Sequence, residues 1–301
     1  MEANIIDNEF LLQDRIQKIK SINELYDLEH NAYISFSGGK DSTVLHHLVD
    51  EALPGNKIPR VYINTGIEYK DVAAFVERER ERDHSRFEII RPQKSIRAIL
   101  EQFGYPFKSK EHSLYLSVYQ NSGQSKSVIK YLQRHDSRFK CPDKMRYQFT
   151  QDFQLKVSNK CCYKLKKDVA EQWRKENYKT ITLTGMRADE GGLRAGIKGC
   201  TIFSDGQLQK FHPLLPLTDD FIDWYIEQRH IELCRLYYPP FNFQRTGCKG
   251  CPYSVDLQKQ LDIMAVYLPE ERRQCEMIWG KVYAEYRRIH YRLEPTLFDN
   301  L

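Results

Sequence analysis

The chain has 301 residues, of which 41% are hydrophobic and 29% are charged, and its formal net charge is +5. This length allows one substantial core with a small appendage. No apolar run approaches the roughly 20 residues that a membrane-spanning helix needs. The first residues carry neither the basic nor the apolar region of a secretion signal, so we expect a cytoplasmic protein with no membrane partner.

Helical and strand-like patterns alternate along most of the chain. Apolar residues recur at helical spacing over residues 9–29, a β-prone run follows at 32–36, and a helix continues to about residue 53. Further on we expect strands at 60–64, 87–92 and 179–185, and helices at 71–82, 96–103, 168–177 and 219–228. This alternation predicts a parallel sheet with right-handed crossovers. We expect an α/β domain over residues 1–255 and a helical C-terminal extension over residues 256–301.

The turn after the first strand predicts a phosphate-binding loop. Two glycines there let the backbone curl so that successive N–H groups point at phosphate oxygens, and the following helix N-terminus favours an anion. The lysine adds a mobile cation, the serines add hydroxyl donors, and the aspartate can hold the turn or a metal ion. The spacing differs from that of the P-loop. The predicted loop consists of Ser37, Gly38, Gly39, Lys40, Asp41 and Ser42.

Several strand ends should meet at one edge of the sheet. Ligands of open α/β sheets bind beyond the carboxyl ends of the parallel strands. The loop at residues 37–42, the segment 64–68, the strand end at Pro92 and the strand end at Gly185 should therefore share one rim.

A basic segment interrupts the α/β pattern between residues 104 and 148. It carries nine Lys or Arg residues against three acids, with seven Tyr or Phe interleaved, and more lysines follow at 156–167. Basic residues mixed with aromatic ones suit a polyanion whose bases can stack, such as a nucleic-acid acceptor. The alternative is a solvated helical face whose aromatic residues belong to the core.

Four of the eight cysteines form a recognisable set: Cys161 and Cys162 are adjacent, and Cys248 and Cys251 form a Cys-x-x-Cys turn. Such a turn places two sulfurs on one side, where a soft metal can take both. Tetrahedral zinc and an iron–sulfur cluster both accept four thiolates, whereas disulfides require an oxidising compartment. Adjacent cysteines chelate one zinc ion only with strain, but the separate iron corners of a cubane cluster suit them. The pair therefore favours a cluster, with zinc as the alternative.

Taken together, these motifs resemble the iron–sulfur branch of the PAPS/adenylyl-sulfate reductase family, within the PP-loop ATP pyrophosphatase superfamily. Their order is Ser-Gly-Gly-Lys-Asp-Ser, Cys-Cys-x-x-Leu-Lys, Thr-Gly-x-Arg and Cys-x-x-Cys, from residue 33 to about residue 253. The resemblance implies an adenine-nucleotide α-hydrolase-like fold, with a parallel twisted sheet flanked by helices. It also implies a [4Fe–4S] cluster held by Cys161, Cys162, Cys248 and Cys251.

The same resemblance implies a nucleotide site for ATP, APS or PAPS, with Mg²⁺ beside the phosphates. Arg187 of the Thr-Gly-x-Arg element would grip the anionic end, since its planar fork meets phosphate oxygens in pairs. The implied catalytic residues are Lys40, Asp41 and Arg187. Beyond the loop, the implied nucleotide-binding residues are Asn64, Thr65, Gly66, Gly185 and Arg187.

One departure from the reductases bears on the reaction. In that family a nucleophilic cysteine lies on a C-terminal tail, whereas residues 292–301 of this chain contain none. Cys275 lies in an expected continuous helix, where a thiol is usually inert. We therefore expect an enzyme that cleaves ATP at the α–β phosphate bond and supports sulfur transfer, with nucleic acid as the acceptor at the basic segment and a separate sulfur-donor protein. The alternatives are a sulfonucleotide reductase that uses thioredoxin and releases sulfite, or a non-catalytic nucleotide-binding module.

Overall fold

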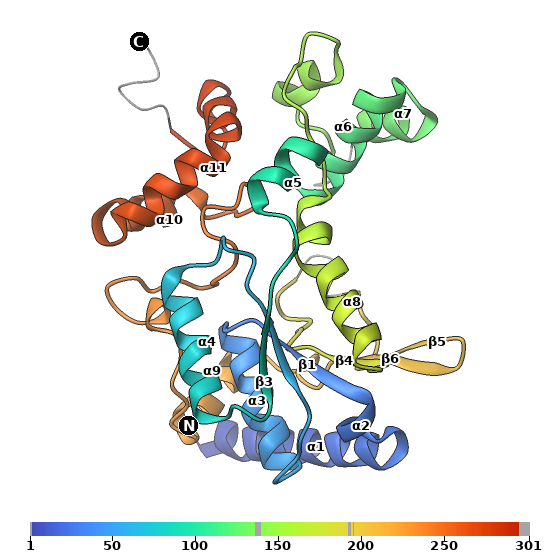
Figure 1. Ribbon diagram of the computed structural model, residues 1–301, viewed down its shortest axis with the longest axis vertical. Helices are drawn as coiled ribbons and strands as arrows, with labels where there is room; N and C mark the ends of the chain where they lie inside the picture. Colours follow the sequence, from blue (N-terminus) through green and yellow to red (C-terminus); the bar gives the residue numbers. More distant parts are fainter. Residues whose placement is uncertain (1, 136–139, 192–193, 195, 295–301) are drawn as a thin grey trace. The chain divides into compact units, whose positions relative to one another are not determined.

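A computed structural model describes residues 2–135, 140–191, 194 and 196–294, with side chains from residue 8 onward (Figure 1). The chain divides into two compact units. The first comprises Met1–Asn64, Lys70–Arg91 and Val169–Thr246, and the second comprises Thr65–Tyr69, Pro92–Asp168 and Gly247–Leu301. The boundary that we expected between residues 255 and 256 lies inside the second unit, because the segment around Cys251 packs with the C-terminal helices.

The first unit contains a six-stranded sheet in the order β3-β2-β1-β4-β6-β5. Its strands are β1 (Ala32–Phe36), β2 (Arg60–Ile63), β3 (Phe87–Ile90), β4 (Ile181–Leu183), β5 (Thr201–Ser204) and β6 (Gln207–Phe211). Five are parallel, and β5 pairs antiparallel with β6. The chain runs outward from β1 through β2 to β3 and then returns to β4 on the other side of β1. This reversal is a topological switch point, where ligands of open α/β sheets bind.

The α/β class with a mostly parallel sheet is confirmed. The expected strands are present, β1 with the expected bounds and β2, β3 and β4 with shorter ones. We did not predict the β5–β6 hairpin. Its turn is Asp205-Gly206, and both residues have positive φ, 51° and 75°. An Asp-Gly pair is a strong sequence signal for a two-residue hairpin turn, so the hairpin could have been predicted.

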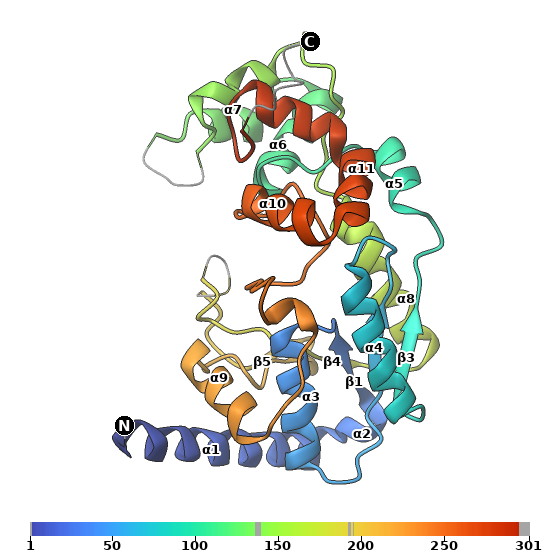
Figure 2. The ribbon, with the colours of Figure 1, turned by 90° about the vertical axis from the view of Figure 1, so that its left-hand side faces the viewer.

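Helices cover both faces of the sheet in the first unit. They are α1 (Glu2–Tyr26), α2 (Leu28–Asn31), α3 (Lys40–Ala52), α4 (Lys70–Arg82), α8 (Asp168–Glu176) and α9 (Asp219–Gln228). Figure 2 shows α1 running across the end of α3. On one face, α1, α3 and α9 bury a continuous apolar cluster against β1, β4 and β6. On the other face, Trp173 of α8 packs on Tyr33 and Val61.

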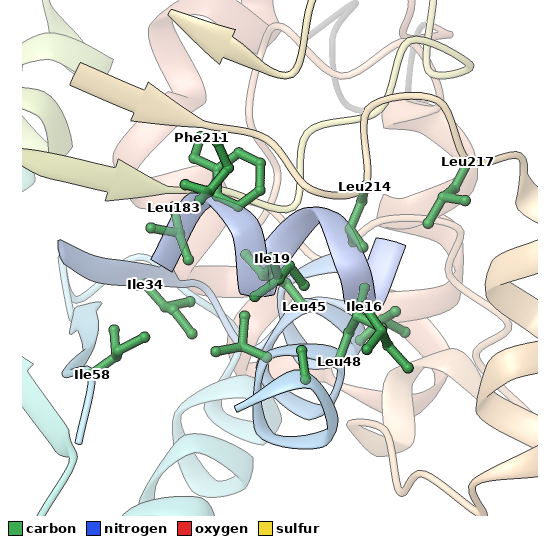
Figure 3. Close-up of a cluster of buried hydrophobic side chains, with 14 of the residues drawn as sticks. Ile16, Ile19, Ile34, Leu45, Leu48, Ile58, Leu183, Phe211, Leu214 and Leu217 are labelled. Carbon is green, nitrogen blue, oxygen red and sulfur yellow. The ribbon is translucent and has the colours of Figure 1, made fainter. Parts of the chain in front are cut away.

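The strand β1 shows how the sequence produces this layering. Successive side chains of a strand point to opposite faces. Ile34 accordingly joins the α1–α3 cluster, and its neighbour Tyr33 contacts Trp173 with ring centroids 5.1 Å apart. Figure 3 shows Ile34 in the cluster with Ile19 of α1 and Leu45 of α3. Each fully buried side chain of this size contributes about 1.5–3 kcal/mol.

The second unit is helical in its described part. Its helices are α5 (Ile96–Phe103), α6 (Lys110–Ser122), α7 (Lys126–Leu132), α10 (Leu257–Tyr267) and α11 (Pro269–Arg288), with a 3₁₀ helix at Asp143–Phe149 and a π-helical turn at Tyr163–Lys167. Ser95, Ser109 and Ser125 cap α5, α6 and α7, each accepting from a backbone N–H of the first turn. Of the basic residues expected around this region, Arg138 lies outside the described residues.

A buried histidine organises the core around α6. His112 Nδ1 lies 2.8 Å from the Tyr131 hydroxyl, and its Nε2 lies 2.7 Å from Gln148 Oε1. A neutral ring satisfies both contacts, because Nε2–H donates to the amide oxygen and Nδ1 accepts from the hydroxyl. Burial lowers the pKa of His112 to about 4.

None of the described helices is both long and apolar enough to cross a lipid bilayer.

Candidate nucleotide and cysteine sites

The expected phosphate-binding loop lies at the carboxyl end of β1, beside the switch point. Gly38 has φ of 69°, and a Cβ there would lie 2.8 Å from Val76 Cγ2 and 2.9 Å from Val72 Cγ1. Glycine is therefore needed both for the turn and for the close approach of α4. The turn delivers the chain to α3, which begins at Lys40.

The two serines of the loop fix its shape. Ser42 Oγ accepts from the backbone N–H of Ser37, donates to Gly39 O at 2.9 Å, and lies 2.9 Å from Ser37 Oγ. Among the described residues, none accepts a hydrogen bond from the backbone N–H of Asp41 or Ser42. These donors at a helix N-terminus remain available to an anion.

The backbone after β4 crosses directly over the loop. A Cβ on Gly185 would lie 2.6 Å from the carbonyl oxygen of Asp41 and 3.1 Å from the nitrogen of Ser42. Glycine at 185 thus permits the Thr-Gly-x-Arg segment to touch the first turn of α3. The structure explains this glycine by packing, while a contact with nucleotide remains a prediction.

Both cations that we expected at the phosphates lie at this loop, and both are paired with carboxylates. Arg187 is 3% exposed, with Nε 2.9 Å from Asp41 Oδ1 and Nη2 2.5 Å from Asp219 Oδ1. Lys40 Nζ lies 2.9 Å from Asp223 Oδ1 and 3.8 Å from Asp219 Oδ1. Arg187 Nη1 also lies 3.7 Å from Asp189 Oδ2, so the two cations share four carboxylates. The grip of Arg187 on an anionic group remains a prediction.

The carboxylates differ in their affinity for a proton. Burial raises the pKa of Asp41, although the positive charge of Arg187 opposes it. Burial also disfavours the charged form of Asp219, but the hydrogen bond and charge of Arg187 outweigh it and lower that pKa. Asp41 is therefore the carboxylate that would gain most from a further cation at the loop.

Sequence reasoning missed two side chains that support this loop. The Tyr237 hydroxyl accepts from the backbone N–H of Lys40 at 2.9 Å and lies 2.8 Å from Thr246 Oγ1. No sequence signal marks Tyr237, because the contact joins residues 197 positions apart. Asp219 and Asp223 were likewise not singled out, although Asp219 lies in the first turn of α9, where acids are a recognisable pattern.

A buried histidine follows β6. His212 Nδ1 lies 2.7 Å from Thr184 Oγ1, and its Nε2 is buried without a hydrogen-bond partner in the described chain. Its position directly after a parallel strand could have marked it as a residue of the rim.

The segment after β2 is divided between the two units. Asn64 belongs to the first, where its N–H donates to Ile90 O at 2.9 Å. Thr65 and Gly66 belong to the second. The N–H and hydroxyl of Thr65 donate to the Glu68 carboxylate at 2.8–2.9 Å. Their expected place beside an adenosine remains a prediction.

The four expected cysteines all lie in the second unit and line one pocket. Cys161 and Cys162 share this pocket with Cys248, Cys251 and Trp279. Among the described residues, no group of three or more His, Cys, Asp or Glu side chains is arranged to hold a single metal ion. A closed zinc site and a [4Fe–4S] cluster both take four thiolates, so the donor set suits either group.

The thiols influence one another electrostatically. Burial raises the pKa of Cys161, and negative charge on Cys162, Cys248 and Cys251 raises it further. Burial and Cys248 together raise the pKa of Cys251 to about 12. A soft metal binds cysteine as the thiolate, so metal binding at this pocket would release the protons of these thiols.

Helix α11 holds the Cys-x-x-Cys loop through its backbone. Trp279 Nε1 donates to Lys249 O at 3.1 Å, the Tyr283 hydroxyl donates to Gly250 O, and the Tyr286 hydroxyl donates to Pro252 O at 2.9 Å. The three donors recur at i, i+4 and i+7 and therefore share one face of the helix.

A lysine and a glutamate also reach this loop. Lys166 Nζ lies 3.1 Å from Glu68 Oε1, and its positive charge opposes the burial that raises the pKa of Cys248. Glu68 pairs with Cys248 in an isolated β-bridge, and the backbone N–H of Lys249 donates to Ile67 O at 2.9 Å. The loop is thus fixed by helix, bridge and ion pair.

Three of the four remaining cysteines are buried and lack the environment of a nucleophile. Cys275 is fully buried in α11, and burial raises its pKa to about 12. Burial likewise raises the pKa of Cys141 to about 11 and raises that of Cys234. Cys200 is half-buried in the first unit.

Comparison with known proteins gives a clear family match. The family model described as "Phosphoadenosine phosphosulfate reductase domain" matches residues 31–139 and 126–254. No curated protein matches significantly. A phosphoadenylyl-sulfate (PAPS) reductase from Candida auris, solved with phosphate, is 13% identical, with a TM-score of 0.47 over 77% of this chain and 87% of that one.

Two further solved structures match over almost the whole chain. An NH3-dependent NAD synthetase from Campylobacter jejuni is 13% identical, with a TM-score of 0.41 over 97% of this chain and 99% of its own. A U34-tRNA thiolase from Methanococcus maripaludis with its [4Fe–4S] cluster is 15% identical, with a TM-score of 0.40 over 97% and 92%.

Proposed function

Because the chain belongs to the phosphoadenosine phosphosulfate reductase domain family, we propose that it is an iron–sulfur enzyme of the PP-loop type. It binds ATP at the loop 37–42, cleaves the bond between the α and β phosphates, and supports sulfur transfer to an acceptor. The observation that carries the proposal is the pocket lined by Cys161, Cys162, Cys248 and Cys251.

The first unit supplies the nucleotide site in this proposal. The free N–H groups of Asp41 and Ser42 bind the pyrophosphate part of ATP at the N-terminus of α3. Lys40 and Arg187 exchange their carboxylate partners for phosphate oxygens, and Asn64 and Gly185 of the same unit lie toward the adenosine.

Magnesium fits the loop through its carboxylates. Mg²⁺ is usually held by one or two carboxylates together with substrate phosphates. Asp41 and Asp219 are two such carboxylates beside the phosphate loop, each within 2.9 Å of Arg187. They would become available to Mg²⁺ when Arg187 turns to the phosphates.

The reaction needs positioning and electrostatic stabilisation rather than a nucleophile from this chain. An oxygen of the acceptor attacks the α phosphorus, the α–β P–O bond breaks, and pyrophosphate leaves with the negative charge. Lys40 and Arg187 stabilise the charge that develops on the leaving group. Sulfur from a donor then displaces AMP from the adenylated acceptor.

The cysteine pocket fits a [4Fe–4S] cluster by its donor set of four thiols and by the rigid support of α11. When bound, the cluster can order or carry the sulfur donor. The protein's own contribution is to hold the four sulfurs and to place the positive charge of Lys166 near Cys248. That charge offsets part of the negative charge of the thiolates.

The burial of Cys275 favours this proposal over a sulfonucleotide reductase. A reductase needs an accessible thiol of low pKa to attack the sulfate sulfur. Cys275 is fully buried and its pKa is raised to about 12.

Two measurements test the proposal. Protein purified without oxygen should contain about four iron and four sulfide per chain. Cys248→Ser should lower both, whereas the matched control Cys200→Ser should not. A colourless protein with one zinc per chain would overturn the cluster.

The second measurement separates the reactions. The iron-loaded protein should release pyrophosphate from ATP, with Lys40→Met slowing this release, and should release no sulfite from PAPS with thioredoxin. Sulfite release that Cys275→Ser abolishes would establish the reductase instead. Tight ATP binding without turnover under any acceptor would support a non-catalytic module.

A further inference from the structure

A second cavity of the second unit lies outside the cysteine pocket and has the chemistry of a nucleobase site. It encloses about 530 Å³ between the end of α6 and the segment 150–157. This volume is within the usual range for small-ligand sites, about 300–1,000 Å³. Three aromatic residues line it, namely Phe103, Tyr119 and Phe153, together with four side-chain amides. Lys156 is the one charged side chain among the described residues that line it.

The wall of this cavity is held in place by its own hydrogen bonds. Gln120 donates from Nε2 to Leu155 O at 2.8 Å and accepts at Oε1 from the Val157 N–H at 3.0 Å. Val157 also forms an isolated parallel bridge with Tyr105. The segment is thereby fastened to α6 whether or not a ligand is present, which lowers the entropic cost of binding.

Other amides of the lining remain available. Within the described part of the chain, no residue hydrogen-bonds the Gln151 side chain, and Gln154 uses only Nε2, which donates to Gln151 O at 2.9 Å. An amide offers a donor and an acceptor side by side, the complement of a nucleobase edge. Aromatic side chains offer the flat surface on which any base can stack.

The shape of the surface favours a chain-like ligand over a single small molecule. A neighbouring cavity of about 500 Å³ shares Thr150, Phe153 and Gln154 with the first. Its lining includes Tyr147, Arg288 and the acids Asp152 and Glu285. The Arg288 guanidinium carbon lies 4.7 Å from the Tyr147 ring centroid, and Arg288 Nη2 donates to Glu285 Oε1 at 2.8 Å. Phe153 lines both cavities, so a strand of linked nucleotides that occupies both would contact its ring.

Lysines lie on and beside the lining of the first cavity, and two of them have partners in the chain. Lys156 Nζ donates to Gln102 O at 2.8 Å, and Lys164 Nζ donates to Asp168 Oδ2 at 2.7 Å. Besides Lys156, the ammonium of Lys160 lies 5.4 Å from the Phe103 ring centroid and that of Lys164 lies 6.0 Å from it. Phosphates attract such lysines whatever the base sequence.

We propose that these two cavities bind single-stranded nucleic acid, with a base stacked on Phe153 and a phosphate near Lys156. The inference deepens the proposed function, since it places the nucleic-acid acceptor within the second unit. Its test is a binding measurement that needs neither ATP nor turnover. The nucleic-acid inference and the proposed ATP-dependent function can therefore fail separately.

The first experiment titrates the full-length protein into fluorescein-labelled 12-mers, as DNA and as RNA of the same sequence. Phe153→Leu keeps an apolar side chain but removes the stacking surface, so affinity should fall at least about fivefold. Tyr178→Leu is the matched control, because Tyr178 is 87% exposed and lies in the first unit. Unchanged affinity in Phe153→Leu, or no binding of either 12-mer to the wild-type protein, would overturn the inference.

The second experiment measures the salt dependence of the same binding. Lys156→Gln should reduce the slope of log K against log salt by about one, as expected for one lost phosphate contact. If a free mononucleotide binds as tightly as the 12-mers, the cavity is a small-molecule site. That result would overturn the inference that a nucleic-acid strand is the ligand. The protein could also bind oligonucleotides through Phe153 and yet be unable to cleave ATP. That result would support this inference and refute the proposed reaction.

Discussion

Replacing Gly185 by alanine tests the contact that joins the Thr-Gly-x-Arg segment to the phosphate-binding loop. The new Cβ would lie 2.6 Å from the carbonyl oxygen of Asp41, whereas ordinary contacts begin at 3.4 Å. The two backbones must therefore separate by about 0.8 Å, the difference between these distances. The neighbour is backbone at the start of α3 and cannot turn away as a flexible side chain could.

We expect this displacement to have two effects. Overpacking of this kind costs about 1–3 kcal/mol of unfolding free energy, and in a chain of this size each kcal/mol lowers Tm by about 2–4 °C. The affinity for ATP should fall at least about tenfold, because a shift near 1 Å in a positioning group costs up to about 100-fold. Thermal unfolding without nucleotide measures the first effect, and titration calorimetry with ATP measures the second.

Gly280→Ala is the control for the same substitution. A Cβ at this position in α11 meets no atom within 4 Å, and helical alanine is more stable than glycine by about 0.5–1 kcal/mol. A Gly185→Ala protein with the Tm and ATP affinity of the wild type would refute the close contact. A lower Tm with unchanged ATP affinity would show that this contact stabilises the fold but does not position the loop for ATP.

Three further changes test the interior of each unit. Arg187→Met should lower the unfolding free energy by about 1–3 kcal/mol because it removes charged hydrogen bonds. A double-mutant cycle with Asp41→Asn, measured by urea unfolding, should give a coupling energy of at least about 0.5 kcal/mol. If the losses of the two single variants simply add, the pairing of Arg187 with Asp41 is contradicted. Folding lowers the pKa of His112 from 6.5 to about 4. As the pH falls from 6.5 toward 4, His112 is protonated in the unfolded chain but not in the folded one, so the unfolding free energy decreases. Between pH 7.5 and 4.5 the wild type should lose about 2.5 kcal/mol more unfolding free energy than His112→Asn. Parallel plots of unfolding free energy against pH for the two proteins would refute this. Tyr283→Phe leaves the carbonyl of Gly250 without its hydrogen-bond donor. The unfolding free energy measured in urea should fall by about 1–3 kcal/mol. An unchanged urea midpoint would show that this hydrogen bond does not hold the cysteine loop.

The sequence predicts the candidate sites better than their internal contacts. The loop residues are contiguous, so the position of Gly38 and Gly39 before a helical pattern indicates a strand–turn–helix unit. Local spacing marks the Cys161–Cys162 pair and the Cys248–Cys251 turn, and the family resemblance implied that the four act together. The structure places all four on one pocket.

Long-range partners were not predictable from these patterns. Arg187 was expected at an anion, but the structure pairs it with Asp41 and Asp219, which are 146 and 32 residues away. The support of the cysteine loop by α11 depends on helix orientation, which local patterns do not encode. The basic residues and aromatic residues of the second unit had predicted a polyanion surface, but they did not indicate the amide-lined cavities.

The sequence by itself thus determined the class of the sheet and the place of the strand–turn–helix loop at residues 37–42, because both depend on residues close together or on simple periodicity. It joined the four cysteines in one set through the family resemblance. Only the tertiary structure decided that Gly185 is needed for a backbone crossing, that both loop cations are paired with carboxylates, and that the Cys-x-x-Cys turn belongs to the helical unit. The physical reason is the same in each case. These features arise from contacts between segments far apart in the chain, and such contacts form only when packing has fixed the direction of every element.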